Sequence, residues 1–205
     1  MRDYFTVSSL TPPLGQDDVR RLALLSCLEL HRVSWHRAYL ASDGTRLFSW
    51  YRAPDGESLR LVLRQQGSPE GDIWFSNVDE EIGRDPDDVI DKPGQVVIEF
   101  EFDTPLDPEG ITSKTKSVSS LLRKLGCFTT RIFTPRGGTR LVYIVNAAHQ
   151  DPIADRLHAE GHTPSAVWLC AEFDPVPENL FGIEDKTTTD VEGMQGIEPL
   201  SLIHI

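Results

Sequence analysis

The sequence lacks long apolar runs, a cysteine framework and a secretory leader pattern. No window approaches the roughly 18 consecutive apolar residues of a membrane-spanning helix, so we expect no membrane partner. The first residues contain neither a basic segment nor a long apolar stretch, so no signal peptide is expected. Three widely spaced cysteines, Cys27, Cys127 and Cys170, cannot form a set of paired disulfides. These features together predict a reducing, cytoplasmic location.

Sequence motifs of common catalytic and binding sites are also missing. The chain has no Cys-x-x-Cys pair, no zinc-type ligand spacing and no phosphate-binding loop. It has no nucleophile elbow either, although a Ser-His-Asp triad assembled from distant residues stays open. The glycines of Arg136-Gly137-Gly138 are explained by a hairpin turn between two strands. The motifs therefore point to no particular reaction.

Negative charge is abundant, but it is concentrated outside the apolar segments. The 205 residues carry a formal charge of −12, and residues 76–94 and 174–205 each hold seven acids. Only two and one basic residues accompany them, so the rest of the chain is nearly neutral. Such acidic runs are typical of solvated, mobile segments. We therefore divide the chain into a first repeat (1–77), an acidic linker (78–94), a second repeat (95–175) and a disordered acidic tail (176–205).

An internal repeat underlies this division. Residues 44–74 align without a gap to residues 138–168, with eight identities in 31 positions. Gly44-Thr45-Arg46-Leu47 returns as Gly138-Thr139-Arg140-Leu141, and Trp74 returns as Trp168. A repeat of this length indicates two copies of one structural unit.

Each copy has the periodicity of a β-α-β-β-α-β unit. In the first copy we expect strands at 3–9, 35–41, 46–53 and 72–77, with helices at 16–31 and 57–66. In the second copy we expect strands at 96–102, 128–134, 141–147 and 166–173, with helices at 111–125 and 151–160. This order is that of the ferredoxin-like unit. The predicted fold is α+β, with two tandem ferredoxin-like repeats packed sheet to sheet as an intrachain dimeric α+β barrel. The predicted chain is a monomer or a homodimer.

The first copy also resembles a family of small ferredoxin-like proteins, mostly uncharacterised, in which one member is described as nickel-binding. The resemblance rests on Ser26-Cys27, Trp35, Tyr39, Tyr51 with Ala53-Pro54, and Gly67 with Pro69. It covers about residues 2–77 well and residues 95–173 loosely. It implies the same fold, and nickel is the only cofactor that it implies.

Ligand positions of that family are replaced in this chain. Its frequent histidines correspond to Arg37 and Val62, and in the second copy to Arg156, while a family cysteine corresponds to Ser49. A guanidinium repels a divalent cation, so we predict weak or absent nickel binding and leave the cofactor unknown. Other possible metal ligands are Cys27 with His31, His158 with His162, and His36. For Cys27 and His31, burial in the core and the helix dipole are the simpler explanations. Gly161 should end the helix between His158 and His162, so these two side chains need not converge.

A predicted hairpin gathers aromatic and basic residues on the face of the sheet without helices. Asp43-Gly44 as a two-residue turn sets Tyr39 opposite Phe48, Arg37 opposite Trp50, and Trp35 opposite Arg52. Arg131 of the second copy should approach this group. The candidate ligand-binding residues are therefore Trp35, Arg37, Tyr39, Phe48, Trp50, Arg52 and Arg131. Phe48 and Trp50 resemble base-stacking positions, but the chain is not basic and lacks the RNA-binding signature, so no nucleic-acid partner is expected.

The sequence thus favours a small-molecule or metal-binding protein with its site between the two sheets. Aromatic faces and guanidinium groups suit a planar or anionic ligand. Glu99 or Glu101 could instead point inward and neutralise an arginine without a ligand. The alternative function is a cofactor-independent enzyme of the monooxygenase, isomerase or cyclase type, a class hosted by α+β barrels. A third interpretation is that the aromatic and arginine side chains only fill an interface.

Overall fold

The structure is a computed structural model, which describes residues 1–24, 28–65, 67, 72–80, 94–147 and 151–175. Everything below concerns these residues. The first half contains β1 (Arg2–Ser9), α1 (Gln16–Leu24), the short 3-10 helix η1 (Glu29–His31), β2 (Ser34–Ala41), β3 (Arg46–Ala53), α2 (Gly56–Gln65) and β4 (Ile73–Glu80). The second half contains β5 (Gly94–Glu101), α3 (Pro108–Lys124), β6 (Phe128–Pro135), β7 (Arg140–Ala147), α4 (Asp151–Ala159) and β8 (Ala166–Phe173).

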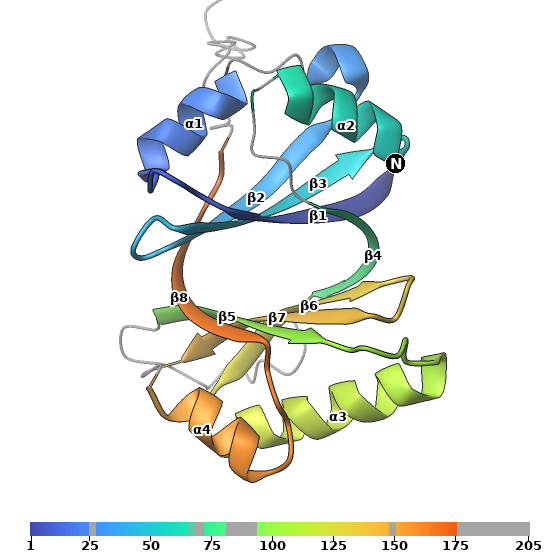
Figure 1. Cartoon of the computed structure of the whole chain (residues 1–205), viewed down its shortest axis with the longest axis vertical. Helices are drawn as coiled ribbons and strands as arrows, with labels where there is room; N and C mark the ends of the chain where they lie inside the picture. Colours follow the sequence, from blue (N-terminus) through green and yellow to red (C-terminus); the bar gives the residue numbers. More distant parts are fainter. Residues whose placement is uncertain (25–27, 66, 68–71, 81–93, 148–150, 176–205) are drawn as a thin grey trace, which may run out of the picture.

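The eight strands form a closed antiparallel barrel in the order β1-β3-β2-β8-β5-β7-β6-β4. Within each half the first strand pairs with the third and the fourth, and the second strand pairs with the third. The last strand of each half then crosses to the other half, so that β4 pairs with β6 and β8 pairs with β2. Helices α1 and α2 cover one side of the barrel, and α3 and α4 cover the opposite side (Figure 1).

The sequence predicted every one of these strands and the four α-helices, with differences at their ends. Strand β4 continues to Glu80 because Val78–Glu80 pair with β6, so the acidic linker begins later than residue 78. Helix α1 ends at Leu24, and the predicted stretch to residue 31 finishes as η1. Residues 81–93 of the linker and the tail 176–205 lie outside the described residues. None of the described helices is long and apolar enough to cross a membrane.

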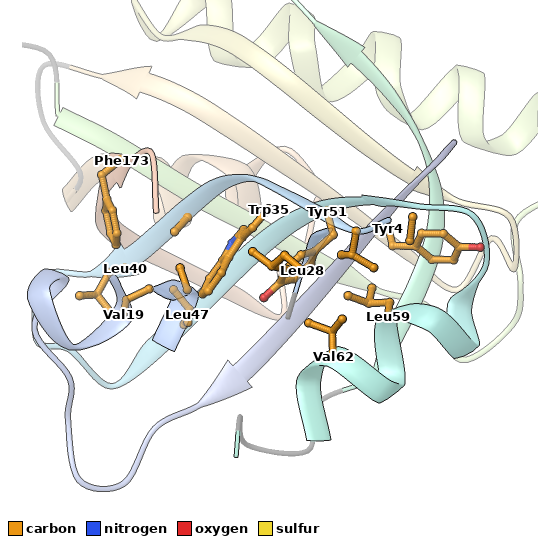
Figure 2. Close-up of a cluster of buried hydrophobic side chains, with 14 of the residues drawn as sticks. Tyr4, Val19, Leu28, Trp35, Leu40, Leu47, Tyr51, Leu59, Val62 and Phe173 are labelled. Carbon is orange, nitrogen blue, oxygen red and sulfur yellow. The ribbon is translucent and has the colours of Figure 1, made fainter. Parts of the chain in front are cut away.

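Three groups of buried apolar side chains hold the barrel and its helices together. The first lies between α1, α2 and their side of the barrel and includes Trp35, Tyr51 and Leu59 (Figure 2). The second fills the equivalent space under α3 and α4. The third occupies the barrel interior, where Phe5, Phe48 and Phe133 contact one another with ring centroids 4.7 to 5.7 Å apart. Aromatic rings thus fill the middle of the barrel.

The repeated Gly-Thr-Arg-Leu segment has the same structural role in both halves. Gly44 and Gly138 adopt φ values of +72° and +64° in the two hairpin turns, which favours glycine. Their carbonyl oxygens accept hydrogen bonds from the backbone N–H groups of Leu14 and Leu106, at 3.0 and 2.9 Å. A Cβ atom on either glycine would lie only 2.5 or 2.3 Å from a backbone carbonyl oxygen of the same loops. Close backbone packing therefore explains why both hairpin turns have a glycine at this position.

A β-bulge in β2 changes which way its first residues point. Tyr39 faces Phe48 and Arg37 faces Trp50, as the turn predicts, but the register then shifts and Trp35 faces Tyr51. Trp35 therefore lies under the helices and not in the barrel interior, so its predicted position beside Arg52 is wrong. His36 takes the inward direction and stacks on Trp50, with ring centroids 5.0 Å apart. A matching shift in β6, between Thr129 and Arg131, occurs at the equivalent place in the second half.

Candidate functional site

Polar side chains converge at the end of the barrel that carries both bulges. We call this the Glu172 end and define it by residues of five strands: Arg37 and Tyr39 of β2, Gln95 of β5, Arg131 of β6, Asn146 of β7 and Glu172 of β8. Tyr39 and Glu172 are opposite each other in the β2–β8 pair. Gln95 is opposite Asn146 on one side and Cys170 on the other.

Glu172 is the centre of this group. Its Oε1 lies 2.8 Å from Arg131 Nη1 and 3.4 Å from Arg37 Nε. The hydroxyl of Tyr39 donates to the same oxygen over 3.4 Å and accepts from Arg131 Nη1 at 2.6 Å. Gln95 Nε2 donates to the other oxygen, Oε2, at 2.5 Å. One carboxylate thus receives hydrogen bonds or ion pairs from both halves of the chain.

The two arginines also have outer carboxylate partners. Arg37 Nη1 lies 3.2 Å from Asp174, and Arg131 Nε lies 4.0 Å from Glu80. The sequence suggested that an anionic ligand would suit these guanidinium groups, but they need no dissolved anion, because Glu172 and Asp174 pair with Arg37, and Glu172 and Glu80 pair with Arg131. Glu99 and Glu101, the acids that the sequence offered as neutralising partners, do not pair with Arg37 or Arg131 in the described structure.

A cavity of about 430 Å³ adjoins the Glu172 end. It is lined by residues of β5, β7 and β8: Gly94, Gln95, Asn146, Leu169, Cys170, Ala171 and Glu172. Two of the lining side chains, Gln95 and Asn146, have a buried oxygen without a hydrogen-bond partner in the described structure. Buried polar atoms are normally paired, so such oxygens mark a place where water or a ligand belongs.

No protein-family model matches the sequence, and no curated protein matches it either. Similar solved structures include one provisionally named as a chlorite dismutase, at 11% identity and TM-score 0.43, covering 85% of this chain and 96% of the other. A second, from Lactobacillus acidophilus NCFM and provisionally named as a monooxygenase, has 9% identity and TM-score 0.43, with coverages of 84% and 94%. An anthrone oxidase-like protein has 10% identity and TM-score 0.41, with coverages of 84% and 92%. None of these likenesses assigns a function to this chain.

The candidate residues from the sequence separate into three groups. Arg37, Tyr39 and Arg131 meet at the Glu172 end. Phe48 and Trp50 belong to the packed barrel interior. Arg52 pairs with Asp3 at 3.0 Å, and Trp35 lies under the helices. The missed residues are Gln95, Asn146 and Glu172, and of these Glu172 could have been found because it alternates with Trp168 and Cys170 along one strand face.

The opposite end of the barrel holds a buried carboxylate, Glu99. It is 1% exposed and accepts a hydrogen bond of 2.8 Å from Trp168 Nε1. Arg46 and Arg140, the repeated arginines, each lie 3.3 Å from its oxygens. Glu99 therefore points inward, one of the possibilities that the sequence left open, but the arginines that it pairs with are Arg46 and Arg140. Its hydrogen bond and ion pairs in the described structure are all within the chain, so it has the character of a structural group.

Two titratable groups near the cavity, the thiol of Cys170 and the phenol of Tyr39, are poorly suited to proton transfer at neutral pH. Burial raises the pKa of the Cys170 thiol to about 12, and it also raises the pKa of Tyr39 well above its usual range. Both groups therefore stay protonated near neutral pH. Burial, with help from Arg52, lowers the pKa of His36, which stacks on Trp50 outside the cavity lining.

The predicted metal ligands do not gather in the part of the chain described here. Among these residues no group of three or more histidine, cysteine, aspartate or glutamate side chains could hold a metal ion. Cys27 lies outside the described residues. His162 contacts Lys114 Nζ and Ser117 Oγ of α3, each at 3.0 Å, while His158 is exposed on α4. Weak or absent nickel binding stays a prediction, which calorimetry on tag-free protein would test.

Proposed function

We propose that this chain is a small-molecule-binding protein with one ligand site in the cavity at the Glu172 end. In this proposal the fold is a fused pair of ferredoxin-like units, and the site belongs to the junction of β5, β7 and β8. The observation that carries it is the pair of unpartnered buried oxygens, on Gln95 and Asn146, in a cavity beside the Glu172 carboxylate. Leaving each buried polar group unpaired costs about 1–3 kcal/mol, which a ligand would recover.

The β-bulges support a site at this end. Bulges concentrate at barrel rims and beside functional sites, where they redirect side chains. Here the two bulges lie next to Arg37 and Arg131, the residues that hold Glu172 from either half. Without the shift, β2 would place Trp35 at this end, as the simple hairpin register predicts.

Differences between the two halves also support a single site. Phe133 is opposite Val78 in one half-barrel junction, whereas Tyr39 is opposite Glu172 in the equivalent junction. The polar pair thus occurs at only one of two related places. Packing of the barrel would be served equally well by apolar pairs at both, so the difference favours a role beyond packing.

Binding fits these groups better than catalysis. The thiol and phenol beside the cavity have raised pKa values, and no activated nucleophile is present among them. The cofactor-independent enzyme remains the alternative function, but no contact at the Glu172 end favours it specifically. The aromatic faces of Phe48 and Trp50 are already covered by neighbouring rings, so a planar group has little room to stack there.

Fragment mapping by NMR tests the proposed site. A mixed set of small amines, carboxylic acids, alcohols and heteroaromatics should shift the amide signals of Gln95, Asn146, Cys170 and Glu172 together. A groove of about 400 Å³ beside α1, lined by residues such as Leu10 and Leu22, serves as the internal comparison. Shifts confined to that groove, or no shifts with any fragment, would show that the cavity at the Glu172 end is not a ligand site.

A further inference from the structure

We infer that the ligand of this site carries an alkyl-linked cation with N–H donors, either an ammonium or a guanidinium group. The inference rests on the proposed function and names the ligand class for the same cavity. Its acceptors are Gln95 Oε1, Asn146 Oδ1 and the carboxylate of Glu172. All three residues line the cavity, and the two amide oxygens are buried and have no partner within the described structure.

The hydrogen bond between Gln95 and Glu172 fixes the direction of the Gln95 amide. A carboxylate accepts hydrogen bonds, so the NH₂ group of Gln95 must face Glu172, and it does so at 2.5 Å. The amide oxygen of Gln95 is then turned away from Glu172 and is left unpaired. Asn146 is directly opposite Gln95 in the β5–β7 pair, so their side chains leave the sheet as close neighbours. The cavity therefore presents neighbouring acceptors in need of donors.

The first half of the chain contains its own cation at the equivalent place. Arg2 is opposite Ala53 and Gly94 is opposite Ala147, so the pair Gln95–Asn146 corresponds to the pair Asp3–Arg52. Arg52 Nε donates to Asp3 Oδ1 at 3.0 Å. In the first half the guanidinium is thus supplied by the protein itself and is held by the side chain directly across from it.

In the second half that guanidinium is missing, while acceptors remain. Asn146 is several atoms shorter than arginine, and it is one of the residues that line the cavity. Gln95 and Asn146 offer oxygens, and Glu172 adds a negative charge where the first half has Val78. An external ammonium or guanidinium would restore the cation that the first half builds in. A carboxylate ligand would instead meet three acceptor groups, and the nearby Arg37 and Arg131 are already paired with acids.

Two cationic probes and three matched controls test this inference in the full-length protein. The probes are n-butylguanidinium and n-butylammonium, titrated at pH 7 while the side-chain amide signals of Gln95 and Asn146 are followed by NMR. The controls have the same chain length: butyrate, 1-butanol and N,N,N-trimethylbutylammonium, a cation without N–H donors. We expect saturable shifts with at least one probe, binding at least tenfold weaker with each control, and a larger effect from whichever probe matches the natural head group.

Substitutions at Asn146 separate recognition from folding. Asn146→Leu replaces the amide by a branched apolar group with the same number of side-chain heavy atoms. It should weaken the probe at least tenfold without lowering the melting temperature, because the lost oxygen has no internal partner. Asn146→Arg supplies the cation internally and should abolish probe binding. Asn77→Leu, at an exposed asparagine of β4, is the matched control and should leave binding unchanged.

The possible failures are distinguishable. Preferred binding of butyrate at Gln95 and Asn146 would overturn the cation and leave the proposed site intact. Equal binding of the trimethylated cation, or an unchanged affinity in Asn146→Leu, would refute recognition through N–H donors. If the probes and the whole mixed fragment set leave these signals unmoved, the proposed binding function fails together with the inference.

Discussion

Replacing Glu99 by glutamine should destabilise the chain strongly, although the change is nearly isosteric. The carboxylate of Glu99 is almost completely buried between the two halves. It pairs with Arg46 from the first hairpin and Arg140 from the second, and it accepts from the indole N–H of Trp168. An amide oxygen can still accept from Trp168, but it cannot neutralise two guanidinium groups.

The expected loss follows from burial. Removing one partner of a buried ion pair typically costs about 3–5 kcal/mol, because the remaining charge stays buried without compensation. Since the indole hydrogen bond survives and Arg46 is partly exposed, we expect the lower limit, about 3 kcal/mol, for Glu99→Gln. Glu101→Gln is the matched control. Glu101 also pairs with Arg140 and lies two residues further along β5, but its side chain is 54% exposed, so its loss should stay within about 1 kcal/mol.

Equilibrium unfolding in urea measures both variants. The midpoint should fall far more for Glu99→Gln than for Glu101→Gln, with the slope of the transition unchanged. Equal losses in the two variants would mean that burial does not decide the strength of this contact. A neutral Glu99→Gln variant would mean that the buried carboxylate is dispensable, and it would refute the reasoning.

Three further predictions concern the turn, the bulge and the histidines. Gly44→Ala should cost about 1–3 kcal/mol more than Gly67→Ala in urea unfolding, since both have positive φ but only Gly44 packs against a carbonyl oxygen; equal costs would contradict the packing argument. Trp35→Ala should lower the unfolding free energy by about 3–5 kcal/mol and leave probe binding at Gln95 intact, because the indole lies under the helices; lost binding in a folded variant would place it at the site. Burial lowers the pKa of His36 and of His162 in the folded protein. As the pH falls, these two side chains therefore become protonated in the unfolded chain before they do in the folded chain, so stability should be lost below about pH 6.5. The melting temperature should therefore decrease from pH 8 to pH 5.5, less so in a variant with both histidines changed to glutamine, and an increase over this range would contradict the sign.

The sequence predicted the elements of the fold because each depends on local patterns. The two-residue turn at Asp43-Gly44 correctly predicted that Tyr39 faces Phe48 and Arg37 faces Trp50. No comparable sequence pattern predicts the bulge between Trp35 and Arg37, because the bulge depends on how the strand fits into the closed barrel. The sequence therefore could not predict the positions of Trp35 and His36, and the predicted position of Trp35 beside Arg52 is wrong.

The site depended on pairing between distant segments, which periodicity does not encode. Glu172 meets Tyr39 only because β8 crosses to the first half and pairs with β2. Gln95 and Asn146 are uncharged, non-aromatic residues of the second copy, so the aromatic and basic pattern of the first hairpin does not single them out. The strand registers are needed to single them out, because only these registers show that the pair Gln95–Asn146 corresponds to the pair Asp3–Arg52 of the first half.

The exchange of final strands also limits how this molecule can meet another protein. Each of the eight strands that the structure describes pairs with a neighbour on both sides, so none of them is an edge strand. A peptide or a second copy therefore cannot add itself as a further strand, which is the usual route to sheet extension and to aggregation through edges. Within the described part of the chain, a partner would therefore be recognised by side chains, on the helices or at the two ends of the barrel.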